Sequence, residues 1–385
     1  MMKIAVATGT RADFGLLRPL MQELKDDSFF KLSVWATAMH LSERFGYTID
    51  EIIKAGFEIH YRIPCLEEND DSIAISKTIS RAIDGFATVI DKEKPDFLII
   101  LGDRTEMLGA AIAATVATIP IIHIHGGETT IGAYDESIRH SITKMSYLHF
   151  TAASVYRNRV IQLGEHPSRV FNVGAIGIDS IKNLPLLSKE ELEVNLNFKF
   201  RKRNVLITFH PVTLESSSAE EQFTAILKAL DELEDTYLIF THANSDKNGK
   251  VINNMIEEYT VLNRDKSLSV ISLGQVRYFS MLQYVDLVLG NSSSGILEVP
   301  YFNIPTINIG DRQTGRLMSQ SVIQCSNKYE DIQKALNLGL DSAFAKAIQK
   351  QSLIYGNGTA TQQIIKILKN FTKASLKKPF YDLPK

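Results

Sequence analysis

The chain has 385 residues, of which 44% are hydrophobic and 22% are charged, and its formal net charge is −2. This length predicts two domains with large cores, and the near-neutral charge excludes the broad cationic surface that binds nucleic acid or anionic membranes. Only two cysteines occur, no signal peptide is visible and no apolar run approaches the roughly 20 residues of a membrane span, so we expect a soluble cytoplasmic protein without disulfides.

Short apolar runs alternate with longer amphipathic stretches through the first half of the chain. The runs predict strands at KIAVAT (3–8), LSVWATA (32–38), DFLIILG (96–102), PIIHIH (120–125) and YLHFTAA (147–153). Helical spacing of apolar residues predicts helices over 72–93, 104–118 and 135–146. Strands that alternate with helices favour a parallel sheet covered on both faces.

The pattern restarts in the second half, after a linker predicted over 176–203. Its strands are predicted at NVLITFH (204–210), TYLIFTH (236–242), LSVISLG (268–274), DLVLGNS (286–292) and PTINIGD (305–311). The fold class is therefore α/β, with two Rossmann-like domains, 1–178 and 179–358, that face a cleft.

The residues that follow the strands carry the functional signal, because ligands of such sheets bind where strands end and helices begin. Turn formation explains Gly, Asn, Asp and Ser in these loops, but it does not explain the arginines and histidines that recur there. They are Arg11, Arg104, His210, His242 and Arg312. Their chemistry predicts a phosphorylated ligand such as a sugar nucleotide.

In the second half, GNSSSG (290–295) ends a strand and opens a helix. Its backbone N–H groups and hydroxyls suit an anion, although plain capping by Asn or Ser explains the same residues. Glu298, about one turn further on, either reaches ribose hydroxyls or is a solvated helix acid. GTRADFG (9–15) is not a GxGxxG fingerprint and no GxxxxGK[ST] occurs, so we expect no cofactor of the NAD or ATP type.

Acids and an imidazole follow successive strands of the first half. Asp103, His125 with Glu128, and Asp135 come from three loops, and proton transfer needs such groups to converge on one point. Two of the acids also have plain explanations. Asp103 suits a helix cap or a pair with Arg104, and Asp135 suits the first turn of a helix on electrostatic grounds.

His123 and His125 alternate along PIIHIH, so a strand would send both side chains to one face. They suit metal ligands, a catalytic base or hydrogen-bonded core groups. A zinc site from both histidines and Glu128 lacks a third His or Cys at a familiar spacing, so we expect no metal. We interpret His123 as a hydrogen-bonded structural residue of the strand.

A set of motifs that appears in order over residues 3 to about 320 resembles the hydrolysing UDP-N-acetylglucosamine 2-epimerase family. The motifs are GTRADFG, GDRxE, GGE…GxxDESIRHSITK, HPVT, GNSSSGILEVP and PxINIGDRQxGR. The resemblance implies a GT-B-like pair of domains, with a C-terminal helix (spacing over 359–374) that returns the segment 359–385 to the first domain. It also implies a UDP-sugar substrate and UDP product, no metal or nicotinamide cofactor, and a homodimer or homotetramer.

By the same resemblance, Val276 would meet the base through its backbone, and Asp103 and Asp135 match two catalytic carboxylates. Further residues would hold the nucleotide and its diphosphate: Arg11, Arg104, His210, Asn244, Ser292, Ser293, Gly295, Glu298 and Arg312. The implied reaction removes the C2 proton while the nucleoside diphosphate leaves C1, which gives a glycal. Water then adds at C1 and a proton returns to the opposite face of C2, which requires two titrating groups.

The sequence departs from the family at HIHGGE, where members that make N-acetylmannosamine commonly read HIEGGE with a catalytic glutamate at the position of His125. The loop TTIGAYDE is also one residue longer. Both departures resemble the legionaminic-acid branch, whose sugar is a 2,4-diacetamido-2,4,6-trideoxyhexose. Two substrates therefore stay open: UDP-N-acetylglucosamine, giving UDP and free N-acetylmannosamine for bacterial nonulosonic acid biosynthesis, and the diacetamido nucleotide.

Three rival functions share the nucleotide half. A GT-B glycosyltransferase would need one base and an acceptor surface, whereas the first half offers several titrating groups. A non-catalytic sugar-nucleotide sensor would keep its behaviour when Asp103 is replaced by Asn. A non-hydrolysing bacterial epimerase would have different residues at the positions of the NSSSG and DESIRHSI segments.

Overall fold

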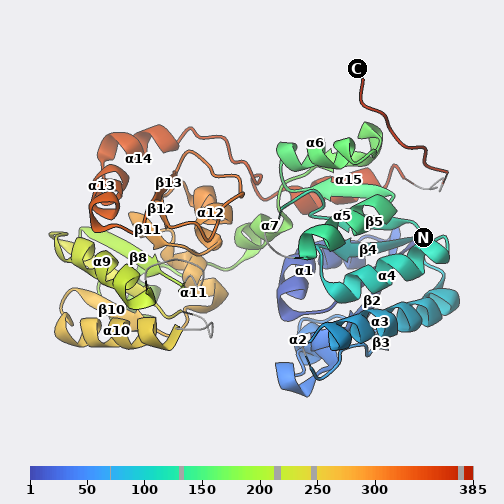
Figure 1. Cartoon of the computed structure of the whole chain (residues 1–385), viewed down its shortest axis with the longest axis horizontal. Coiled ribbons are helices and arrows are strands. Elements are labelled where there is room, and N and C mark those ends of the chain that lie inside the picture. The colour runs from blue at the N-terminus through green and yellow to red at the C-terminus, as the bar shows by residue number, and fades with distance from the viewer. Residues whose placement is uncertain (70, 130–133, 212–217, 244–248, 372–376, 385) are drawn as a thin grey trace. The chain divides into compact units, whose positions relative to one another are not determined.

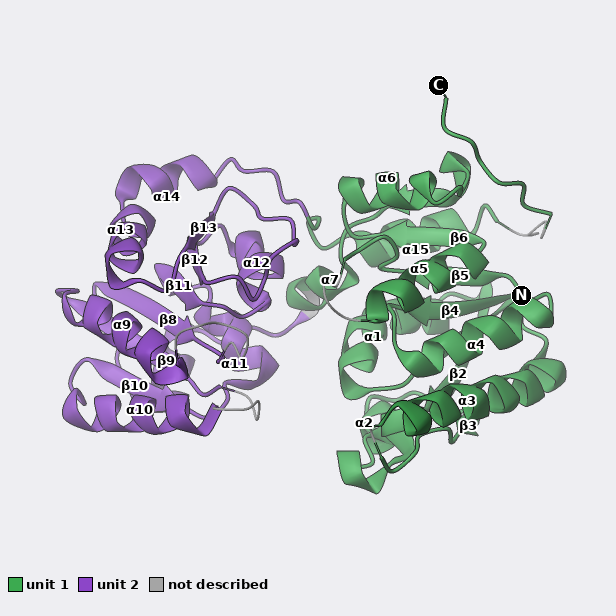
Figure 2. Cartoon of the chain, viewed as in Figure 1, with its two compact units in different colours: residues 1–182, 355–385 green, residues 183–354 purple. Residues whose placement is uncertain are grey.

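The computed structural model describes residues 1–69, 71–129, 134–211, 218–243, 249–371 and 377–384. They form two compact units, unit 1 (Met1–Lys182 with Tyr355–Lys385) and unit 2 (Asn183–Ile354), which Figure 2 colours separately. Each unit is a doubly wound α/β fold, as the sequence predicts (Figure 1). No helix of the described residues is long and apolar enough to cross a membrane.

The described residues of unit 1 contain a seven-stranded parallel sheet. In spatial order its strands are β3 (Tyr61–Ile63), β2 (Phe30–Thr37), β1 (Met2–Thr8), β4 (Phe97–Leu101), β5 (Ile121–Ile124), β6 (Leu148–Thr151) and β7 (Val170–Asn172). The order reverses between β1 and β4, and a sheet of this kind binds ligands beside such a reversal. The two edge strands, β3 and β7, were not predicted because three residues are too few to show a period.

Helices cover both faces of this sheet. They are α1 (Arg11–Asp26), α2 (Ile49–Lys54), α3 (Ser72–Glu93), α4 (Thr105–Val116), α5 (Asp135–Met145), α6 (Ser154–Gln162), α7 (Ile176–Asn183) and α15 (Ala360–Leu368). One core joins α1 and α15 through residues such as Leu17 and Ile364. A second core, on the other side, joins α3, α4 and α5 through Phe86, Ala110 and Ile142. The buried apolar area of these cores is the main stabilising contribution.

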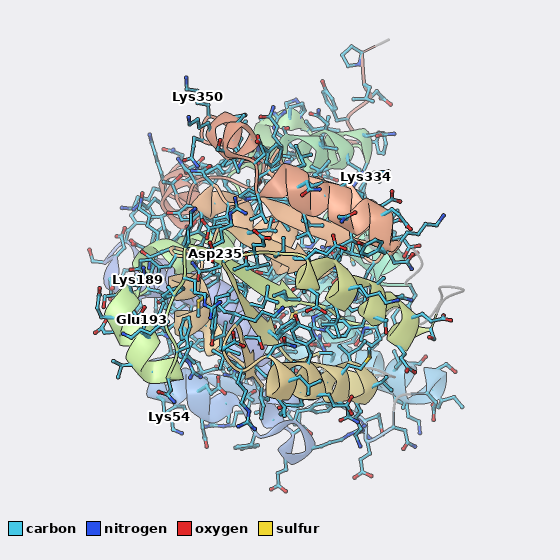
Figure 3. All side chains as sticks on the ribbon, turned by 90° about the vertical axis from the view of Figure 1, so that its left-hand side faces the viewer. Lys54, Lys189, Glu193, Asp235, Lys334 and Lys350 are labelled. Atoms are coloured by element: carbon cyan, nitrogen blue, oxygen red, sulfur yellow. The ribbon has the colours of Figure 1, made fainter. Side chains whose placement is uncertain are left out.

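The described residues of unit 2 contain a six-stranded parallel sheet. Its spatial order is β10 (Ser267–Val270), β9 (Thr236–Thr241), β8 (Arg203–Thr208), β11 (Leu287–Gly290), β12 (Thr306–Ile309) and β13 (Val322–Cys325). Its helices are α8 (Lys189–Leu196), α9 (Ala219–Asp231), α10 (Gly249–Leu262), α11 (Gly274–Met281), α12 (Ser294–Leu297), α13 (Tyr329–Gly339) and α14 (Ser342–Ile348). Lys189, Lys334 and Lys350 are among its exposed side chains (Figure 3).

Two predicted segments differ from the structure. The linker predicted over 176–203 contains α7 and α8, and α8 is fixed by a capping box in which Ser188 and Glu191 satisfy each other's backbone N–H groups. The C-terminal helix predicted over 359–374 spans Ala360–Leu368 and is followed by a turn at 369–370. The predicted helix was too long because Phe371, which packs on the unit 1 core, extends the helical spacing of apolar residues past the end of α15.

Candidate active site

Neighbouring strands of unit 1 end at residues that the sequence predicts to be catalytic. Asp103 follows β4 after Gly102, whose φ of 72° favours glycine, and His125 follows β5. Because β4 and β5 pair in the sheet, their carboxyl ends lie side by side. Asp135 opens α5 on the same side, close enough for its charge to raise the pKa of Asp103.

Arg139 connects these groups. It is 8% exposed, it donates one Nη2 hydrogen bond to Asp103 Oδ2, and its Nη1 donates to the backbone oxygen of His125 at 2.9 Å. The same Nη1 lies 4.0 Å from Glu128 Oε2. Sequence reasoning missed this residue, although its position four residues after Asp135 places both on one face of α5.

His125 lies in the turn after β5 and not in the strand, so the prediction that it shares a strand face with His123 is wrong. Its φ of 63° is left-handed, a region that histidine enters more readily than β-branched residues. Its Nδ1 lies 2.9 Å from Glu128 Oε1. Its Nε2 is buried and has no hydrogen-bond partner among the described residues. A carboxylate on Nδ1 favours the tautomer that leaves a lone pair on Nε2, which is the form of a general base.

Whereas His125 has the form of a base, Asp103 has properties of an acid. Burial raises the pKa of its carboxyl above the ordinary value, the charge of Arg139 opposes that rise, and the charges of Asp135 and Glu128 add to it. A carboxyl with a raised pKa retains its proton to higher pH and can act as an acid. The cluster of Asp103, His125 and Glu128 around Arg139 therefore offers both a base and an acid.

His123 is structural, and the sequence interpretation of it is confirmed. Its Nε2 lies 2.7 Å from the backbone oxygen of Gly102, and its Nδ1 lies 3.0 Å from Thr143 Oγ1 on α5. Burial lowers the pKa of its imidazole to about 3, so the ring is neutral. It ties the turn before Asp103 to α5.

Two acids that sequence reasoning also missed, Asp13 and Glu106, interact with Arg104. Arg104 Nε donates to Glu106 Oε1 at 2.8 Å, and Glu106 is 1% exposed. Asp13, in the first turn of α1, has one carboxyl oxygen that is buried without a partner among the described residues. Burial raises the pKa of Asp13 to about 6, with Arg104 lowering it and Glu106 raising it. The two acids lie within the motifs GTRAD and GDRTE, each two residues after the arginine.

Arg11 is placed differently from Arg104. Its side chain is 75% exposed, and its Nε pairs with Glu51 Oε2 of α2 at 3.1 Å. An exposed arginine at the start of a helix is available to a ligand, but Arg11 would have to give up its ion pair with Glu51 to bind one.

In unit 2 the loops after β8, β11 and β12 meet at Asn291, another residue that sequence reasoning did not single out. Its side-chain amide forms a ring of two hydrogen bonds with the backbone of His210, accepting from N at 2.8 Å and donating to O at 2.7 Å. Its own backbone oxygen accepts from Arg312 Nη1 at 3.2 Å and from Gln313 Nε2 at 2.9 Å. Asn291 is fully buried, so this geometry is fixed.

The GNSSSG segment opens a helix, as predicted, but α12 has only four residues and leads into the 3-10 helix Val299–Phe302. Its dipole is correspondingly small, so Ser292 and Ser293 would act through hydroxyl and N–H groups. Gly295 has a packing role, because an added Cβ would lie 2.8 Å from Thr306 Cγ2.

Glu298 is not a solvated helix acid. Burial raises the pKa of its carboxyl, and a hydrogen bond from Ser294 opposes the rise; Ser294 Oγ also lies 2.6 Å from Tyr278 OH. Val276 lies in the first turn of α11, where a backbone N–H has no partner within the helix. Asn244 lies outside the described residues.

Comparisons with known proteins show the family and the fold of this chain. A sequence profile of a family described as UDP-N-acetylglucosamine 2-epimerase matches residues 22–369. A GDP/UDP-N,N'-diacetylbacillosamine 2-epimerase (hydrolyzing) of Campylobacter jejuni is 43% identical over 91% of this chain and 88% of its own length. A UDP-N,N'-diacetylbacillosamine 2-epimerase (hydrolyzing) of Legionella pneumophila is 36% identical over 95% of each chain. The crystal structure of a Neisseria meningitidis UDP-GlcNAc 2-epimerase bound to UDP-GlcNAc has the same fold, with a TM-score of 0.78 at 17% identity over 96% of this chain and 100% of that one.

Proposed function

Because this chain belongs to the hydrolysing branch of the UDP-N-acetylglucosamine 2-epimerase family, we propose that it converts a nucleotide-linked 2,4-diacetamido-2,4,6-trideoxyglucose (N,N'-diacetylbacillosamine) to a free 2-epimer and a nucleoside diphosphate. The observation that carries the chemistry is the cluster of Asp103, His125 and Glu128 around Arg139. The names of the Campylobacter and Legionella relatives support the substrate.

The proposed first half-reaction is an elimination. His125 Nε2, held as a base by the Nδ1 contact with Glu128, takes the C2 proton as the C1–oxygen bond breaks and its electron pair leaves with the diphosphate. A C2 proton is weakly acidic, so departure of the diphosphate must be stabilised in the same step. Arg104 and the Asn291-ordered loops of His210 and Arg312 are the groups proposed for that role.

The second half-reaction adds water across the glycal double bond. The hydroxyl goes to C1, and Asp103, whose pKa burial raises above its ordinary value, is the group proposed to deliver a proton to the other face of C2. Asp135 keeps the pKa of Asp103 high through its charge. The proton that water loses when its hydroxyl adds to C1 restores Asp103, and the proton that His125 took from C2 passes to solvent. The products are one free sugar epimerised at C2 and one nucleoside diphosphate, and both side chains return to their starting states.

The second candidate substrate is UDP-N-acetylglucosamine, which the family description favours. What argues against it is His125, since a histidine stands where family members that make N-acetylmannosamine commonly have a catalytic glutamate. A glycosyltransferase ranks lower, because transfer needs one base and this site offers a base and an acid on neighbouring strands.

Incubation with each nucleotide sugar in D₂O, followed by ³¹P and ¹H NMR, tests the proposal. We expect release of UDP and a free sugar that carries deuterium at C2, with kcat/KM at least about tenfold higher for the diacetamido nucleotide, a difference of 1.4 kcal/mol. An intact nucleotide sugar that exchanges at C2 would identify a non-hydrolysing epimerase instead. A glycosylated acceptor would identify a transferase.

The setting of the reaction is part of the same proposal. We infer a role in bacterial nonulosonic (sialic or legionaminic) acid biosynthesis in the cytoplasm, which the free thiols of Cys65 and Cys325 support. The expected assembly is a homodimer or homotetramer, which light scattering of the purified protein measures directly.

A further inference from the structure

The C-terminal segment 377–384 packs on unit 1 beyond α15, and it contacts the end of α5. Tyr381 N donates to the backbone oxygen of Gly164 at 2.9 Å. The ring of Phe380 lies so close to Gly164 that an added Cβ there would come within 2.2 Å of it. Lys144 Nζ, in the last turn of α5, lies 4.6 Å from the centre of the same ring. The segment is therefore held by backbone, apolar and cation–π contacts together.

Lys378 makes the deepest of these contacts. Its Nζ lies 2.7 Å from the backbone oxygen of Lys144 and 2.5 Å from that of Ser146, the two carbonyls at the end of α5. It also lies 2.9 Å from each carboxylate oxygen of Glu165. The Lys378 side chain is 19% exposed and that of Glu165 is 0% exposed.

This arrangement is a helix cap supplied from a distant part of the chain. The last carbonyls of a helix have no partner within it, and a cation is favoured there by the helix dipole. The carboxylate of Glu165 stays charged to compensate the cation. Although burial acts to raise its pKa, hydrogen bonds from His149, Lys144 and Lys378 bring the pKa of Glu165 down to about 2.

The capped helix is the one that carries the proposed catalytic groups. Asp135 opens α5, Arg139 in its second turn holds Asp103 and the His125 backbone, and Thr143 near its end is tied through His123 to Gly102. A shift of α5 along its axis would move all of these contacts at once, because a helix is stiff and rises 1.5 Å per residue.

We propose that Lys378 is a positioning residue, which fixes α5 through the carbonyls of Lys144 and Ser146 and so sets the geometry of Arg139, Asp103 and His125. The proposal rests on the proposed function for the part played by α5 in catalysis. Lys378 itself touches no substrate, and its effect on turnover passes through the helix.

The test compares Lys378→Met with Lys377→Met, which removes the neighbouring, exposed lysine as a matched control. For Lys378→Met we expect kcat to fall on the order of tenfold to a hundredfold, the effect of a small displacement of reacting groups, with the affinity for UDP in calorimetry unchanged. The UDP affinity is spared because none of the proposed nucleotide contacts lies on α5. Lys378→Arg should recover part of the lost kcat, since a guanidinium also donates to carbonyls and carboxylate.

Hydrogen exchange measured without substrate separates this idea from the proposed function. In Lys378→Met the amides of α5 should exchange at least tenfold faster than in Lys377→Met, whether or not either nucleotide is turned over. Unchanged α5 exchange, an unchanged kcat, or an equal loss of UDP affinity would each overturn the proposal. If Lys378→Met does not fold, Phe380→Ala is the alternative, because it weakens the packing of the segment and leaves Lys378 in place as the partner of the buried Glu165 carboxylate. Phe380→Ala should show the same faster exchange of the α5 amides and a smaller loss of kcat. If neither changes, the proposal that Lys378 positions α5 is refuted.

Discussion

Replacement of Asp13 by Asn is expected to stabilise unit 1 at neutral pH. Asp13 has a pKa of about 6 in the folded chain against an ordinary value of 3.8, with burial as the main cause. A carboxyl whose pKa is raised on folding contributes stability below its unfolded pKa and loses it as pH rises through the folded pKa. The difference of about two units corresponds to about 3 kcal/mol as an upper bound at pH 7 to 8. Asn keeps the shape and cannot ionise, so the variant avoids this loss.

The assay is urea unfolding at pH 4 and at pH 8, followed by the fluorescence of Trp35, the single tryptophan, which is buried in unit 1. The gain in unfolding free energy should be large at pH 8 and close to zero at pH 4. Asp26→Asn, an exposed site on the same helix, is the control and should show no gain that grows with pH. A gain of equal size at both pH values, or a loss at pH 8, would refute the reasoning. Activity should fall as stability rises, since the charge beside Arg104 is lost.

Four further outcomes are expected. Asp103→Asn should lower kcat by about 10²–10⁴-fold, the range for loss of an acid–base group, while UDP binding measured by calorimetry persists; a variant that keeps its turnover contradicts the assignment. His125→Glu should shift kcat/KM toward UDP-N-acetylglucosamine relative to the diacetamido nucleotide, and unchanged or absent activity on the simple nucleotide breaks the link between this position and substrate. Asn291→Ala should weaken UDP binding by about tenfold or more, because two buried backbone groups lose their partners at a cost of about 1–3 kcal/mol each; unaltered affinity removes these loops from the nucleotide site. Gly290→Ala should prevent folding of unit 2, since the φ of Gly290 is 146° and an added Cβ would lie 1.8 Å from a backbone oxygen. Gly15→Ala is the control: Gly15 lies in a helix, an added Cβ there would meet no atom within 4 Å, and the variant should raise the melting temperature slightly.

The pattern of residue types along the chain is enough to predict the regular elements and the chemistry at their ends. Runs of apolar residues placed ten of the strands to within a few residues, because a strand buried on both faces must be apolar along its whole length. It also placed Asp103, His125, His210 and Arg312 in strand-end loops, since the doubly wound topology brings such loops to one edge of the sheet. The short edge strands β3, β7 and β13 left no such pattern.

Which groups meet, and how their pKa values shift, depends on the packing of segments that are distant in the chain. Arg139 reaches Asp103 across 36 residues, Asn291 reaches His210 across 81, and Lys378 reaches Glu165 across 213. Neither partner of such a pair carries a local signal, because hydrogen-bond geometry depends on how distant segments pack. Burial, which raises the pKa of Asp13 and lowers that of His123, is likewise a property of the packed sheet and its helices and cannot be read from the residue alone.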